Sequence, residues 1–169
     1  MNKDEYSNYS FEKAKQLTKV AIPPNFDIII SNFFRLCHSL TTVSLPSTVT
    51  RICCKAFSHC DSLTEISLPS KLQEIEDMAF IGCTPLKEII IPSSVTSIGS
   101  SAFEGCSSLT YVELSYRLTV INSSTFKNCI SLFQILIPSS VTNIGKYKKL
   151  YNKKKKLILV NIKNSIRFK

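Results

Sequence analysis

The sequence predicts an α/β repeat solenoid, in which short turns of the chain stack on one another. Two observations carry this prediction. Cysteine recurs every 23 residues along the 169-residue chain, and a leucine follows each of these cysteines by three positions. A fixed period in this range is typical of repeat arrays, in which each turn buries its apolar side against its neighbours. The cysteines of this row are Cys37, Cys60, Cys83, Cys106 and Cys129.

Residues 63–85 illustrate the repeat unit. Apolar side chains recur over residues 63–68, which predicts a short strand, and Pro69 ends it because proline has no amide donor. Residues 72–75 are expected to be extended, since too little chain follows for a long helix. Alanine, phenylalanine and cysteine within residues 79–83 suit a single helical or 3₁₀ turn that places the ring and the thiol in the core.

The run IPSSVTSIGSSAFEGCSSL, from Ile91 to Leu109, resembles the BspA-type leucine-rich repeat, an interaction repeat found in large surface-antigen families. The resemblance covers roughly residues 17–145. It implies a leucine-rich-repeat solenoid, a right-handed coil with a parallel β-sheet on its concave face and short helical turns or extended segments on its convex side. It implies protein binding and supplies no catalytic residue.

Three parts are expected along the chain. Residues 1–16 form an N-terminal cap, with an amphipathic helix over residues 3–16 that is also a degenerate repeat. Residues 17–145 form the array, with five full turns and a partial sixth. Residues 146–169 form a basic, lysine-rich tail without repeat character. The apolar run at residues 157–162 is either a makeshift cap or an aggregation-prone segment.

The charge of the chain is divided between the array and the tail. The net charge is +9, but residues 1–145 contain 11 Lys and Arg against 12 Asp and Glu, whereas residues 146–169 contain 10 basic residues and no acidic one. The basic character therefore belongs to the tail, where salt-sensitive binding to a polyanion or an anionic membrane is an alternative function. A non-functional fragment of a longer repeat surface antigen is a further alternative.

The cysteine row is interpreted as packing, because its members fall at one inward-facing repeat position. Reduced, buried thiols that act as small apolar side chains are expected there, while the state of Cys53 and Cys54 stays open. A zinc site formed by Cys37-His38 and His59-Cys60 is a weaker alternative, since it requires two of these cysteines to turn outward.

No catalytic motif or phosphate-binding loop is present in the sequence, so neither an enzyme nor a cofactor is expected. The sequence predicts instead a protein–protein interaction scaffold that binds through strand residues on the exposed concave face. These form two rows that begin at Lys19 and Ala21 and continue as Thr42, Glu65, Glu88, Tyr111 and Gln134, and as Ser44, Ser67, Ile90, Glu113 and Leu136.

Two features of the sequence bear on location. Its first ten residues are polar and acidic where a secretory signal would be apolar, and no run reaches the ~20 apolar residues of a membrane-spanning helix. A cytoplasmic location is therefore expected, with the cell surface, reached by a leaderless route, as the alternative.

Overall fold

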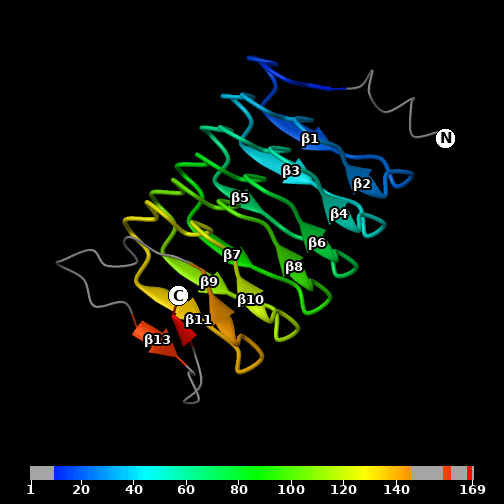
Figure 1. Cartoon of the computed structure of the whole chain (residues 1–169). Coiled ribbons are helices and arrows are strands. Elements are labelled where there is room, and N and C mark those ends of the chain that lie inside the picture. The colour runs from blue at the N-terminus through cyan, green and yellow to red at the C-terminus, as the bar shows by residue number, and fades with distance from the viewer. Residues whose placement is uncertain (1–9, 146–157, 161–166, 169) are drawn as a thin grey trace.

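The computed structural model describes residues 10–145 and the strand positions 158–160 and 167–168. In this part of the chain the backbone winds into a parallel-strand solenoid of about 5 turns (Figure 1). We call the repeat units coils 1 to 6; they begin at Leu17, Leu40, Leu63, Leu86, Leu109 and Leu132.

The first strand of each coil contributes to one parallel sheet, called the first sheet. Its neighbours are hydrogen-bonded in two groups, β1-β3-β5 and β7-β9-β11-β13. Partner residues lie one repeat apart, as Lys19 and Thr42 do, which confirms the predicted register. The strands are β1 (Lys19–Ala21), β3 (Thr42–Ser44), β5 (Glu65–Ile66), β7 (Glu88–Ile90), β9 (Tyr111–Glu113), β11 (Gln134–Leu136) and β13 (Ile158–Val160).

The second strand of each coil contributes to a second parallel sheet, which is divided in the same way into β2-β4-β6-β8 and β10-β12-β14. Between the two strands of a coil lies a tight turn, in which the amide of Leu72 donates to the carbonyl of Pro69 at 3.0 Å. The strands are β2 (Ile28–Ile29), β4 (Arg51–Ile52), β6 (Glu74–Ile75), β8 (Ser97–Ile98), β10 (Val120–Ile121), β12 (Asn143–Ile144) and β14 (Arg167–Phe168).

The expected helical turns are absent from the described residues, where the third side of each coil is a ribbon of consecutive β-turns. Alternate amides of this ribbon donate to the next coil, as Phe57 does to the carbonyl of Ala79 at 2.8 Å. Left-handed φ values of 58° at Met78 and 74° at Gly82 interrupt any right-handed helix. Bonds between coils therefore satisfy backbone groups that a single helical turn would leave unpaired.

A row of phenylalanines fills the core behind this ribbon. Successive rings stack with centroids 5.1 to 5.6 Å apart. Burying one such ring contributes about 1.5–3 kcal/mol relative to exposing it, so the row is a main source of stability. The row consists of the buried Phe34, Phe57, Phe80, Phe103 and Phe126, with Phe11, which is 40% exposed, at its N-terminal end.

The cysteine row lies beside the phenylalanines and is buried, as predicted. Each thiol also donates a hydrogen bond to the carbonyl of the phenylalanine in the preceding coil, for example from Cys83 to Phe57 at 3.0 Å. Burial raises the pKa of the Cys37 thiol to about 11 and that of the Cys129 thiol to about 12. The described cysteines are free, and those of the row are protonated donors as well as small fillers.

The N-terminal end differs from the expected capping helix. Residues 10–16 form turns, and the rest of the predicted helix lies outside the described residues. The amide of Phe11 donates to the carbonyl of Phe33 at 2.8 Å, and its ring stacks on Phe34 with centroids 5.6 Å apart. These contacts follow the pattern of the later coils. Because backbone amides of residues 10–16 donate hydrogen bonds to coil 1, a helix is not needed to satisfy them.

At the C-terminal end, two strands of the tail extend the sheets. Strand β13 pairs with β11 and β14 pairs with β12, both in parallel. Leu159 lies opposite Ile135, a step of 24 residues where the array uses 23. Of the two interpretations of the apolar run at residues 157–162, the pairing of residues 158–160 favours the cap, since it occupies a sheet edge; the rest of the run lies outside the described residues.

Candidate functional site

The outer surface of the first sheet carries the residues selected from the sequence. The strand pairing aligns Glu88 with Tyr111 and Tyr111 with Gln134, so these side chains form a row across coils. Inward-facing residues of the same strands, such as Ile89, are buried. We call the following ten residues the first-sheet face: Thr42, Ser44, Glu65, Ser67, Glu88, Ile90, Tyr111, Glu113, Gln134 and Leu136.

The chemistry of this face changes along the solenoid. Thr42 and Ser44 are small and polar, whereas Glu65 and Glu88 place two carboxylates side by side in the middle. Ile90 is 56% exposed, which is unusual for so large an apolar side chain. The face therefore combines negative charge with exposed apolar surface.

Tyr111 joins the acidic and apolar parts of the face. Its hydroxyl donates to a carboxylate oxygen of Glu113 at 3.1 Å. Partial desolvation, the hydrogen bond to Glu113 and the nearby charge of Glu88 together raise the pKa of the Tyr111 hydroxyl. The phenol thus stays protonated and amphipathic, with an apolar ring and a polar tip.

The first sheet is interrupted between β5 and β7. At the β1–β3 junction the amide of Thr41 donates to the carbonyl of Thr18 at 2.7 Å, and at the β7–β9 junction the amide of Thr110 donates to that of Lys87 at 2.8 Å. Across the described residues 63–68 and 86–92, no corresponding backbone hydrogen bond is formed. We call these two segments the β5–β7 junction.

Three residues explain the interruption. Pro85 occupies a position that is serine before coils 2, 3, 5 and 6. The amide or hydroxyl of that serine bonds to the preceding coil, as the hydroxyl of Ser62 does to the carbonyl of His38 at 2.6 Å. Glu88 stands opposite Glu65, and like charges on adjacent strands destabilise the pairing.

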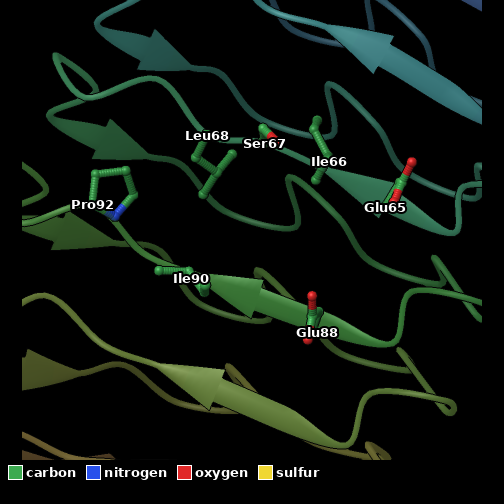
Figure 2. Close-up of a pocket in the computed structure, with 7 residues that line it drawn as sticks. All are labelled: Glu65, Ile66, Ser67, Leu68, Glu88, Ile90 and Pro92. Carbon is green, nitrogen blue, oxygen red and sulfur yellow. The ribbon is translucent and has the colours of Figure 1, made fainter.

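A pocket of about 260 Å³ lies over this junction. Figure 2 shows Glu65 and Glu88 at one end of it and Leu68 and Pro92 at the other. The pocket is therefore amphipathic, with carboxylates facing one end and aliphatic surface the other. Its remaining lining residues are Ile66, Ser67 and Ile90.

The outer surface of the second sheet offers a contrast. There Arg51 pairs with Glu74 at 3.1 Å and approaches Glu76 at 3.9 Å, so the acidic side chains are neutralised within the protein. This sheet is also interrupted, between β8 and β10, but the side-chain amide of Asn122 donates to the carbonyl of Ile98 at 2.7 Å and occupies the free acceptor. On the first-sheet face, by contrast, Glu65 and Glu88 have no ion pair among the described residues.

The residues of the zinc alternative do not converge. Cys37 and Cys60 are buried and donate to backbone carbonyls at 2.9 and 3.1 Å, while His38 lies 2.6 Å from a carboxylate oxygen of Asp61. No group of three or more metal-binding side chains occurs among the described residues. The requirement that these cysteines turn outward is not met.

Sequence reasoning identified the rows of the face but missed the junction and its pocket. The signals were present. Pro85 breaks the serine pattern that precedes the strands of other coils, and Glu65 and Glu88 are adjacent members of one row. Together they indicate a place where neighbouring strands cannot pair fully.

The chain was compared with known families and structures. The model of the BspA type leucine rich repeat region matches in 6 copies, over residues 4–110 and 27–158. No match was found among curated proteins. Within the described residues, no helix has the length and apolar character needed to cross a membrane.

Several solved structures resemble this fold. A leucine-rich repeat protein from Bacteroides ovatus is 34% identical, with a TM-score of 0.77 over 81% of this chain and 36% of that one. The leucine-rich repeat protein of T. pallidum is 35% identical, with a TM-score of 0.74 over 76% of this chain and 63% of that one. The pneumococcal vaccine antigen PcpA is 25% identical, with a TM-score of 0.64, over 75% and 35%. The chain thus spans less than two thirds of each of these structures. It belongs to the BspA-type leucine-rich repeat family.

Proposed function

We propose that this protein is an interaction scaffold that binds another protein through the first-sheet face. The observation that carries the proposal is the pairing of exposed apolar surface at Ile90 with carboxylates that lack an ionic partner among the described residues. Apolar side chains at the centre of a face contribute most to protein binding, and surrounding charges set the partner's orientation.

Binding fits the described chemistry better than catalysis does. The thiols of the cysteine row are buried and protonated, so they are poor nucleophiles. His38 is paired with Asp61, both about half exposed, and neither residue lines the pocket at the β5–β7 junction. A non-catalytic role also agrees with the repeat family to which the chain belongs.

A displayed library of random peptides, selected against the full chain, tests this proposal. Tyr111→Arg places a bulky charge on the first-sheet face, and Ser97→Arg places the same charge on the second sheet. Selected binders are expected to lose affinity for the Tyr111→Arg variant and to retain it for the Ser97→Arg variant. Equal binding to both variants would overturn the proposal.

The division of charge favours a second, independent activity. Residues 146–169 carry 10 basic residues and no acidic one. We propose that this tail binds polyanions such as nucleic acid or anionic lipid, with an affinity that falls steeply as salt rises. A filter-binding titration with single-stranded DNA at increasing salt tests it, and a salt-independent affinity would contradict it.

A further inference from the structure

We propose that the pocket at the β5–β7 junction binds an extended segment of the partner protein that presents a basic side chain and an aliphatic side chain on one face, two residues apart. This inference rests on the proposed function of the first-sheet face and specifies the chemistry of the partner. The segment is identified by three properties of the pocket: its uncompensated charge, its apolar end and the spacing between the two.

The negative charge of the pocket indicates that the ligand segment carries a basic side chain. Several other acidic side chains of the described array have basic partners, such as Glu12 with Arg35 at 2.6 Å and Glu104 with Lys127 at 2.5 Å. Glu65 and Glu88 have no hydrogen-bond or ion-pair partner among the described residues, although they are neighbours in one row. A lysine or arginine placed between them would relieve their mutual repulsion, which an acidic or neutral side chain cannot do.

The opposite end of the pocket calls for an aliphatic group. Leu68 packs only partly against the core, Pro92 is half-buried, and Ile90 is exposed beside them. Covering this surface with an aliphatic side chain would remove apolar area from water at about 25 cal/mol per Å². The pocket volume of about 260 Å³ has room for side chains of this size.

The spacing between Glu88 and Ile90 indicates that the ligand segment has an extended backbone. Glu88 and Ile90 are two residues apart on one strand, so both project from the same face. A ligand strand lying along β7 repeats this spacing, with its basic side chain over Glu88 and its aliphatic side chain over Ile90. A helical ligand would place side chains two residues apart on different faces and could not meet both ends at once.

Fluorescence anisotropy with the full chain tests the inference. The probe is a labelled synthetic peptide that repeats lysine, serine, leucine and serine, so that lysine and leucine alternate on one face when it is extended. The comparison peptide has glutamate in place of lysine. The lysine peptide is expected to bind, and Glu65→Gln with Glu88→Gln is expected to weaken its affinity about tenfold, because two exposed ion pairs are lost.

Two further variants separate the ends of the pocket. Ile90→Ser is expected to weaken binding of the lysine peptide about three- to tenfold through loss of apolar contact. Glu74→Gln with Glu76→Gln is the matched control, since it removes two carboxylates from the second sheet, and it is expected to leave the affinity unchanged. Thermal unfolding of each variant confirms that the fold persists.

Each outcome decides the question. Equal weakening by the Glu65/Glu88 double variant and by the Glu74/Glu76 double variant would reduce the effect to net charge and overturn the inference. Binding of the glutamate peptide with an affinity that depends on Ile90 would also overturn the inference. The same holds if the wild-type chain self-associates through residues 146–156 and binds the lysine peptide only when the lysines of that segment are replaced. If library binders depend on Tyr111 but the lysine peptide does not bind, the proposed function stands and the inference fails.

Discussion

The interior rows and the first-sheet face are built from the same coils, yet they vary in opposite ways. Phenylalanine recurs at its interior position from Phe34 to Phe126, and each ring meets the next at nearly the same distance. On the face, neighbouring positions hold threonine, glutamate, tyrosine and glutamine in turn. In the core, every coil must present side chains of the same shape to its neighbours. On the exposed face, packing against the neighbouring coils does not require the same residue at each position. The difference teaches that fold and binding depend on separate sets of side chains.

The largest expected effect is alkaline unfolding through the cysteine row. Unfolded thiols ionise above their usual pKa of 9.0, while burial raises the folded pKa to about 11 at Cys37 and about 12 at Cys129. Stability is therefore full below pH 9 and is lost as the pH rises through the folded pKa values. Between its unfolded and folded pKa, each thiol lowers the free energy of unfolding by up to about 1.4 kcal/mol per pH unit.

Urea unfolding at a series of pH values measures this loss. The Cys83→Ala variant is the matched control, since alanine already stands at the equivalent Ala14. Its unfolding free energy should fall less steeply above pH 9 than that of the wild type. An identical slope would show that the row does not contribute to the alkaline transition.

The second prediction compares the two regions directly. Phe80→Ala removes a fully buried ring that stacks on both neighbours and is expected to cost about 3–5 kcal/mol. Glu88→Ala changes an exposed side chain on the face and is expected to stay within about 0.5 kcal/mol. Urea unfolding of both variants checks the pair, and equal losses would refute the assignment of inside and outside.

Deleting residues 146–169 is expected to have a smaller effect on stability. It removes the pairing of β13 with β11 and of β14 with β12, and we expect a loss of about 1 kcal/mol, seen as a lower melting temperature. Polyanion binding should vanish. Replacing the four lysines at residues 153–156 with glutamine is the control, because it should weaken polyanion binding while leaving the melting temperature unchanged. Retained polyanion binding by residues 1–145 would contradict the division of charge.

The smallest expected effect is the difference in stability between alanine substitutions at two glycines of the same repeat position. Gly82 and Gly105 both have left-handed φ values, so alanine is strained at either by about 1 kcal/mol. A Cβ at Gly82 would also lie 2.4 Å from the His59 ring, whereas at Gly105 the nearest atom is 3.6 Å away. Gly82→Ala should therefore cost about 0.5 kcal/mol more than Gly105→Ala. The reverse order in thermal unfolding would show that the His59 ring moves aside freely.

Much of this structure could be predicted from residue spacing. The repeat step gave the strand register, because each coil must place its phenylalanine and cysteine against the same residues of its neighbour. The prediction of a helical turn at residues 79–83 was wrong, because residue spacing alone cannot distinguish hydrogen bonds within a coil from hydrogen bonds to the next coil. The thiol donor role was also missed, because burial of cysteine does not reveal a carbonyl within reach.

The candidate site was less predictable. The ten face positions follow from strand alternation, but the interruption at the β5–β7 junction depends on which backbone groups lack partners. Pro85 and the neighbouring Glu65 and Glu88 act on the same pair of strands, and their combined effect appears in the pairing of the coils rather than in any single position. Local departures from a repeat consensus are thus the places where such a sequence is most informative.

Hydrogen exchange with and without a library-selected binder tests the central claim most directly, namely that the first-sheet face binds the partner. The amides of Lys87 and Glu88 lack an inter-coil acceptor across the β5–β7 junction and should exchange quickly in the free protein. Bound to the selected peptide, residues 64–68 and 86–92 should become protected, while residues 96–98 of the second sheet stay unchanged. Protection of the second sheet alone, with none at the β5–β7 junction or in strands β9 and β11, would contradict the account.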